Sequence, residues 1–391
     1  MDLETAVTIA GGRITGPADL HDALPAPEID LIGKWVRSIQ RFIDAVCREA
    51  QRGSGAPRGP LSVVLTRSPS LALRTRRLDD GSVVLLLPVG AIVRPRLLAT
   101  LLLTFPPRDT TISFPASIRD DRPETDWELP NRLLPIFGEF VDDDEHWELL
   151  GHLAAGMTPS TDADLNLALR DVTWAAMCYA VMHEVAHVTR GHLDAEHTFR
   201  ERGPTPRPAL SLRELRRGLE IDADANGSIL FLVALMARLE EMEATQHFTS
   251  AFEWIGFAIP MFLGMYDTRR KALGLYAEGL YPHPVVRHEL FVRVCANYLH
   301  AHKREWLDDW LHYEPDGWTS CIKALWRLDE DCVLGRFSDP PQEGWRCAPI
   351  TAVNWHATDS PAIFSSLEQE TALHQDVVVL LSAWQGEPEA R

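Results

Sequence analysis

The chain has 391 residues, of which 46% are hydrophobic and 24% charged, as in globular proteins rather than disordered chains or coiled-coil rods. Its 38 basic and 56 acidic residues give a formal net charge of −18. Because a surface this negative repels phosphate backbones, we expect no nucleic acid as a main partner. A chain of this length can bury a proper core, in two domains or in one elaborate domain.

The start of the chain is acidic and mixed, and it lacks the basic residues and the continuous apolar stretch of a secretory signal. The longest apolar runs, 228–237 and 254–266, fall short of the roughly 20 residues that span a bilayer. We therefore expect buried helices and no membrane partner. The six cysteines include no CxxC pair, which favours reduced thiols. Together these features predict a cytoplasmic protein.

The first hundred residues predict a mixture of helix and strand. Helices are expected at 30–52 and 94–104, and the glycine- and proline-rich stretch 53–60 predicts a loop. Three apolar or alternating segments predict strands: LSVVLT, LALRTRRL and SVVLLL. The last two flank Asp79-Asp80-Gly81, a turn sequence in which glycine tolerates the positive φ of a tight hairpin. We interpret these strands as a small antiparallel sheet.

Three regions are expected along the chain. The proline-rich segment 106–126 is the best candidate for a subdomain connection, so residues 1–125 form an N-terminal α+β region. Residues 126–300 form the core that carries the motifs, and residues 301–391 form a tryptophan-rich, helical C-terminal region. Core filling is the favoured interpretation of its seven tryptophans, with a partner-binding surface as the alternative. These tryptophans stand at positions 306, 310, 318, 326, 345, 355 and 384.

Two long helices are expected in the core region. The first covers 164–192, is apolar nearly all round before His183, and ends near Gly191. A proline-containing loop follows it. Ser211 and Glu214 have the spacing of a capping box, which predicts that the second helix begins there and runs towards Met242.

The first helix carries the sequence HEVAH. His183 and His187 are four residues apart, so they lie on one face, one turn apart, and can bind the same ion. Glu184 lies about 100° round the helix, where it can reach a water on that ion instead. This is the H-E-x-x-H pattern of zinc sites. The alternative is a buried helix whose histidines hydrogen-bond to backbone or carboxylate groups.

The second helix supplies two carboxylates in the sequence RRGLEIDADANG. Catalytic zinc takes three protein ligands, and Glu220 is a suitable third. Asp224, four residues on and on the same face, can accept the second N–H of a liganding imidazole. The alternative, a solvated acidic face, is disfavoured because Leu219, Ile221 and the following apolar run predict a largely buried helix.

Over residues 172–290 the chain resembles a known family. HEVAH followed by Glu220-Ile-Asp-Ala-Asp224 is similar to the gluzincin zinc metallopeptidases, and LEIDADANG is similar to the Ste-type and HtpX-type endopeptidases and to the Lit-type phage-exclusion peptidases. HEVAHVTRGH also resembles the ImmA/IrrE-type peptidases. Metzincins are excluded by spacing, since they need glycine and histidine where Arg190 and Leu193 stand. The resemblance implies an α+β fold, a mainly helical zincin-like catalytic domain with the small sheet contributed by the N-terminal half.

A third segment, GLYPHPVVRHEL, resembles the His-Pro element at the substrate cleft of the HtpX-like group. The resemblance implies catalytic roles for His283 and Arg287, with His283 or Tyr281 as donor to the oxyanion. The arginine comes earlier than is usual in that group, and Arg293 is a second candidate. An ordinary proline-rich turn is the alternative.

The resemblance implies a Zn²⁺-dependent endopeptidase that cleaves a cytosolic protein or peptide substrate. Zinc held by His183, His187 and Glu220 would activate a water, and Glu184 would take its proton. An extended substrate would pair with a sheet edge, for which 82–87 is the candidate strand. Regulation by a protein partner and a role in phage defence are further expectations. The alternative is a catalytically silent binding or sensor module of the same shape, which would have no need of Glu184.

Overall fold

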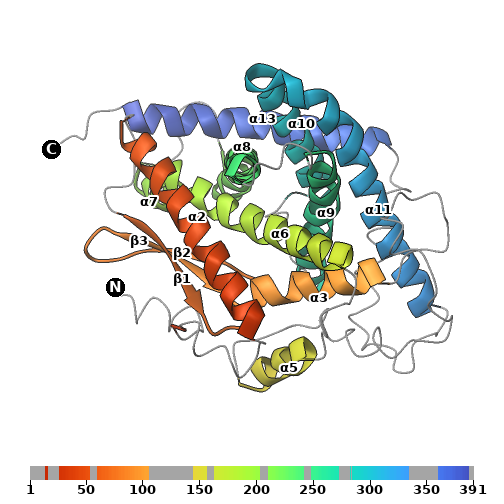
Figure 1. Ribbon diagram of the computed structural model, residues 1–391. Helices are drawn as coiled ribbons and strands as arrows, with labels where there is room; N and C mark the ends of the chain where they lie inside the picture. Colours follow the sequence, from red (N-terminus) through yellow and green to blue (C-terminus); the bar gives the residue numbers. More distant parts are fainter. Residues whose placement is uncertain are drawn as a thin grey trace.

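A computed structural model describes residues 14–15, 26–52, 60–104, 144–155, 163–202, 210–241, 248–272, 282, 284–333 and 360–386. This part of the chain is mostly helical, with one small three-stranded sheet near the N-terminal end, which is an α+β composition as expected (Figure 1). The helices are α2 (Ala26–Arg52), α3 (Gly90–Thr104), α5 (Asp144–Ala155), α6 (Ala163–Thr189), α7 (His192–Arg202), α8 (Leu212–Glu241), α9 (Phe248–Ala272), α10 (Pro284–His302), α11 (Leu307–Val333) and α13 (Ser360–Gly386).

The sheet contains β1 (Leu61–Thr66), β2 (Arg74–Arg77) and β3 (Val83–Pro88), in the order β1-β3-β2. The hairpin is confirmed, because β2 and β3 are antiparallel and Gly81 has a φ of 81°. The prediction of an antiparallel sheet is wrong for the other pair, since β1 and β3 run parallel. The structure therefore contains a mixed sheet. The physical reason is that β3 inserts between the two earlier strands.

The central place of β3 also corrects the predicted substrate edge. All six residues of β3 are buried: Val83, Leu85 and Leu87 join the main core, while Val84 and Leu86 form a small cluster on the other face. A strand that is apolar on both faces is stable where both faces are covered, and β3 meets this condition and also has a strand paired at each of its two edges. The segment 82–87 is thus no edge, and among the described residues β2 lies at the edge instead.

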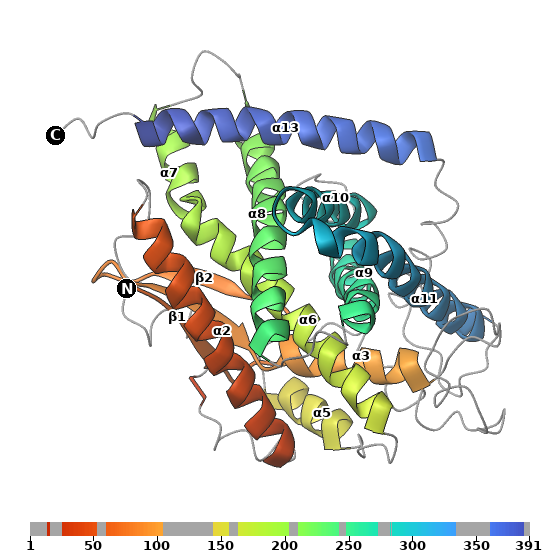
Figure 2. The ribbon, with the colours of Figure 1, turned by 45° about the horizontal axis from the view of Figure 1, so that its top comes forward.

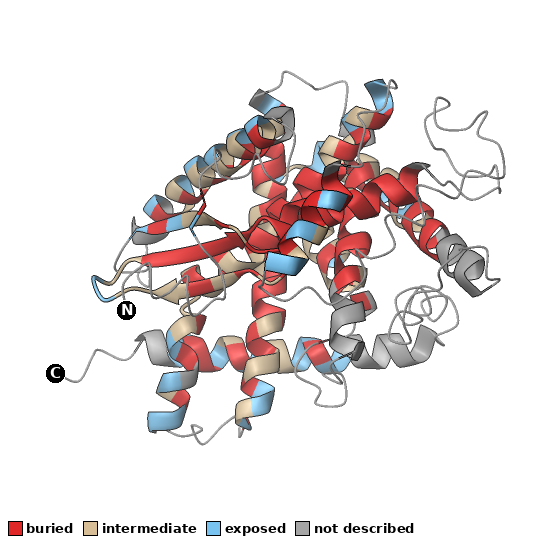
Figure 3. Ribbon diagram, turned by 90° about the horizontal axis from the view of Figure 1, so that it is seen from below, coloured by how far each residue is buried: buried red, intermediate tan, exposed pale blue. Residues whose placement is uncertain are grey.

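The two predicted helices of the core region are present as α6 and α8. The residues of α6 from Val172 to Met182 are buried. Figure 3 shows that buried residues gather in the middle of the molecule. After α6 ends, Gly191 has a φ of 77°, the left-handed conformation that a helix stop requires. The capping box at the start of α8 forms as expected, because Ser211 and Glu214 exchange side-chain and backbone hydrogen bonds.

The helices form one main hydrophobic core and a smaller second one. The main core joins the sheet with α2, α3, α5, α6, α8, α9, α10 and α11. The second core lies where α13 crosses α7 and α8, as Figure 2 shows, and it contains Ala195, Phe199, Leu210, Leu215, Leu219, Val377, Leu380 and Leu381. The C-terminal helix α13 is therefore packed directly on the helix that carries Glu220.

Several sequence predictions concern the remaining parts of the chain. Trp310 is fully buried in the main core, as core filling predicts, whereas the side chains of tryptophans 326, 345, 355 and 384 lie outside the described residues. The candidate connection 106–126 also lies outside them, and the division into three regions stays a prediction. Within the described residues, no helix has the length and apolarity that crossing a membrane requires.

Candidate metal centre

Close packing of α6 on α8 brings the two sequence motifs together. A Cβ added to Gly227 of α8 would lie 2.8 Å from the Cα and 2.9 Å from the backbone nitrogen of His183 in α6. Only glycine allows the two helices to approach this closely at that point. One and two turns before Gly227, Asp224 and Glu220 are consequently brought against the histidines of α6.

His183, His187 and Glu220 form a three-ligand group. The two Nε2 atoms are 3.1 Å apart. Glu220 places one carboxylate oxygen 3.4 Å from Nε2 of His183 and the other 3.7 Å from Nε2 of His187. Two ligand atoms that are each about 2.0–2.2 Å from a tetrahedral zinc lie roughly 3.3–3.6 Å apart. The group can therefore hold a metal ion with small side-chain adjustments.

His183 is oriented by Asp224, which in turn is anchored by Arg287. Asp224 lies 2.9 Å from Nδ1 of His183, and Arg287 donates two hydrogen bonds of 2.6 and 2.7 Å to the same carboxylate. Burial lowers the pKa of His183, but its hydrogen bonds to Asp224 and Glu220 more than offset burial and raise the pKa to about 9. The two carboxylates thus stabilise positive charge at this position, carried by a proton on His183 or by a cation that takes the place of that proton.

His187 is oriented by a different partner. Its Nδ1 lies 2.9 Å from Nδ1 of His192, whose Nε2 lies 2.9 Å from a carboxylate oxygen of Asp222. Burial lowers the pKa of His187 to about 3, so its imidazole is neutral near pH 7. A neutral imidazole is the form that binds metal, and both histidines keep Nε2 directed towards Glu220.

Glu184, the expected general base, is half-buried beside the three ligands. Its carboxylate accepts a 2.6 Å hydrogen bond from the hydroxyl of Thr75, a buried residue of β2. Burial raises the pKa of Glu184 above its ordinary value, an effect that His183 and the Thr75 hydrogen bond oppose. A raised carboxyl pKa suits a group that must take and return a proton near neutral pH.

The structure assembles some predicted site residues and places others elsewhere. His183, Glu184, His187, Glu220 and Asp224 are gathered as described above. Arg287 is buried and donates two hydrogen bonds to Asp224, so its contacts are those of a residue that positions Asp224. The second candidate, Arg293, is half-exposed and pairs with Glu289. Tyr281 and His283 lie outside the described residues.

Sequence reasoning missed three contributors to the site: Thr75, His192 and Asp222. His192 offered a signal, since the pair Gly191-His192 directly follows a helix that ends in HEVAH. Asp222 lies between the two carboxylates already selected, and nothing local distinguishes it from a surface residue. Thr75 carries no signal, because its contact with Glu184 joins residues 109 positions apart.

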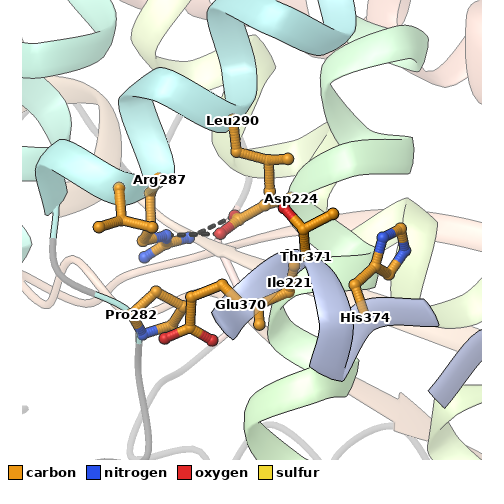
Figure 4. Close-up of a pocket in the computed structure, with 9 residues that line it drawn as sticks. Ile221, Asp224, Pro282, Arg287, Leu290, Glu370, Thr371 and His374 are labelled. Carbon is orange, nitrogen blue, oxygen red and sulfur yellow. Dashed lines mark hydrogen bonds and ion pairs between the residues drawn. The ribbon is translucent and has the colours of Figure 1, made fainter. Parts of the chain in front are cut away.

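A small, partly open pocket adjoins the site on the Arg287 side, where α8, α10 and α13 meet (Figure 4). The Asp224–Arg287 pair forms part of its wall, so the pocket is separated from His183 by that ion pair. Its lining residues are Ile221, Asp224, Pro282, Val286, Arg287, Leu290, Glu370, Thr371 and His374.

In comparisons with known proteins, no protein family, no curated protein and no solved structure matches the chain.

Proposed function

We propose that the protein is a zinc-dependent endopeptidase with the zincin arrangement that the sequence resembles. The observation that carries the proposal is the position of Glu184. Glu184 directly follows the ligand His183 in the sequence and its carboxylate accepts a hydrogen bond from Thr75, which supports assigning it the part of general base for hydrolysis next to the three-ligand group. A silent binding module would need the three ligands but would gain nothing from a positioned, partly buried carboxylate next to them.

Two histidines, one carboxylate and no thiolate form a ligand set that suits zinc. When bound, zinc supplies a Lewis acid that polarises a peptide carbonyl and acidifies a water. With metal bound, Asp224 and His192 would each accept the Nδ1 proton of one ligand histidine, which would leave both Nε2 lone pairs to the metal.

Glu184 performs the proton transfers in this proposal. It takes a proton from the attacking water and passes it to the leaving amine. Thr75 fixes one carboxylate oxygen, so the base is held in place before substrate arrives. His283 and Tyr281 remain the proposed donors to the oxyanion.

The substrate is proposed to be an extended segment of a protein, paired with the outer edge of β2. This strand replaces 82–87 in that role because β2 lies at an edge of the sheet and carries Thr75, which contacts Glu184. Main-chain pairing of this kind binds a segment without reading its sequence, so side-chain pockets must set specificity. A cytoplasmic, regulated enzyme that acts on few proteins, as in phage exclusion, is the setting we propose.

Replacing Glu184 by glutamine tests the proposal. Glu184→Gln should keep zinc and trap bound proteins in cells, and purified wild-type enzyme should then cleave the trapped proteins several orders of magnitude faster than the variant does. Thr75→Val should lose less, because it removes one hydrogen bond to the base and leaves the base in place. Equal cleavage by wild type and Glu184→Gln would refute the catalytic assignment, and trapped proteins that wild type leaves intact would favour the binding module.

A further inference from the structure

His192 is the first residue of α7, and its ring packs against the end of α6. The positive φ of Gly191 turns the chain between the two helices, so His192 lies against His187 with their ring centres 4.9 Å apart. The side chains of His192 and Asp222 are 2% and 1% exposed. A buried imidazole between a proposed metal ligand and a buried carboxylate has little freedom to adopt a second orientation.

When His187 binds metal, the hydrogen bonds that link His187, His192 and Asp222 allow only one arrangement of protons. The metal takes the lone pair of Nε2, so the proton of His187 is on Nδ1 and is donated to Nδ1 of His192. His192 must then carry its own proton on Nε2, which donates it to Asp222. The Nδ1 acceptor of His192 thus exists only because Asp222 accepts from the opposite side of the ring.

Asp222 is itself fixed by groups from its own helix and from other elements. Arg190, just after α6, donates to one carboxylate oxygen at 3.0 Å, and Asn226 of α8 donates to the other at 3.1 Å. His374 of α13 lies 2.8 Å from that second oxygen. The carboxylate therefore joins the ligand helix α6, the helix α8 and the C-terminal helix α13 at one point.

We propose that His192 and Asp222 are positioning residues for the metal, which fix the tautomer and ring orientation of His187, and that His374 of α13 completes their hydrogen-bond network. The inference rests on the proposed metal site and adds to it a second route by which a ligand is held. It differs from a merely structural role, in which His192 fills space between α6 and α7 and its loss changes stability alone.

The test compares variants of His192 in the full-length protein. His192→Leu keeps much of the volume but offers no acceptor to His187. His192→Asn keeps an acceptor oxygen near the position of Nδ1 but cannot reach Asp222 with a donor. The matched control is His197→Leu, because His197 stands on the same helix, is 74% exposed and pairs only with Glu201 among its described ion-pair contacts.

Two readouts report on the ligand rather than on the fold. The first is the zinc dissociation constant, measured by competition with a chelator of known affinity. The second is the visible absorption of the cobalt-substituted protein, which reports ligand geometry. We expect His192→Leu to weaken zinc binding about 10-fold to 100-fold and to change the cobalt spectrum. His192→Asn should fall between that variant and wild type, His374→Leu should lose a few-fold, and His197→Leu should match wild type.

The outcomes separate this inference from the proposed function. Wild-type protein that binds no zinc would refute both. Zinc affinity and a cobalt spectrum unchanged in His192→Leu, even with a lower melting temperature, would overturn the positioning role and leave the metal site standing. If His192→Leu does not fold, His192→Asn and Asp222→Asn decide the question by the same two readouts, and wild-type behaviour in both would overturn the inference.

Discussion

The two histidines of the proposed metal site are held by different means. His183 donates directly to Asp224, and Arg287 neutralises that carboxylate from behind. His187 contacts His192, which in turn contacts Asp222, and residues from several elements bind the carboxylate of Asp222. Both carboxylates come from the same stretch of α8 and both are almost completely buried. The comparison teaches that one buried helix, α8, can orient both ligand histidines from two of its faces. The first route is direct, a hydrogen bond from His183 to Asp224. The second route, from His187 through His192 to Asp222, is distributed over several elements.

The largest expected difference between the two routes concerns stability. Arg287 is 7% exposed and is the cation paired with Asp224, whereas Arg190 is 33% exposed and shares Asp222 with two histidines. Arg287→Leu should lower the free energy of unfolding by about 3–5 kcal/mol, because a buried charge loses its partner. Arg190→Leu should cost less than about 1 kcal/mol. Urea unfolding of both variants with chelator present measures this, and equal losses would contradict the comparison.

Metal affinity should also differ between the two routes, by a smaller free energy, and the loss should again be larger for the route through Asp224. Asp224→Asn removes the charge directly behind His183, so we expect zinc to bind about 10-fold to 100-fold more weakly. Asp222→Asn should lose a measurable but smaller amount, a few-fold, because an amide oxygen can still accept from His192, though more weakly than a carboxylate. Competition with a chelator compares the two, and the reverse order would show that the distributed route is the stronger one.

The backbone next to His183 offers a third comparison. Gly227→Ala should destabilise the protein by about 1–3 kcal/mol, because the added methyl group meets the backbone of His183 and the two helices must separate. The matched control is Gly264→Ala in α9, where the added Cβ would lie 4.0 Å from a flexible Leu325 methyl group, at ordinary van der Waals distance. That substitution should be neutral or stabilising by up to about 1 kcal/mol. Thermal melting of the two variants gives the answer, and similar melting temperatures would be evidence against tight packing at His183.

A carboxyl group far from the site gives the smallest expected effect and a useful contrast. Asp222 and Asp224 have lowered pKa values because their cationic and imidazole partners outweigh burial, whereas burial and nearby Asp316 raise the pKa of Glu253 to about 7. A raised folded-state pKa means that the protonated form is favoured in the fold. The stability it contributes is complete below the unfolded value of about 4.5 and is lost as the pH rises through about 7.

Glu253→Gln, which mimics the protonated form, should therefore raise the melting temperature at pH 8 relative to wild type and leave it nearly unchanged at pH 4.5. Melting curves at the two pH values test this. A gain of the same size at both would mean that the carboxyl charge has no part in it.

Much of the candidate metal centre follows from the sequence because its signals are local. His183, His187, Glu220 and Asp224 follow helical spacing within two helices, and the capping box and Gly191 mark where those helices begin and end. The burial of Asp224 was predictable from its apolar neighbours in α8. These residues needed no knowledge of how distant segments pack.

The rest depended on contacts between distant segments. Thr75 of β2 meets Glu184 of α6 across 109 residues, a contact that no local pattern in the sequence marks. His374 meets Asp222 across 152 residues. Asp222 illustrates the limit most clearly, because its neighbours in the sequence are the same as those that identify Asp224, while its partners come from α7 and α13.

Zinc stoichiometry tests the central claim most directly. Elemental analysis of protein purified without added metal should find about one zinc per chain in the wild type. The His183→Ala, His187→Ala double variant should contain none above background, while the exposed-site control His197→Leu should keep its zinc. Wild-type protein without zinc, or a double variant with the same zinc content as wild type, would contradict the account.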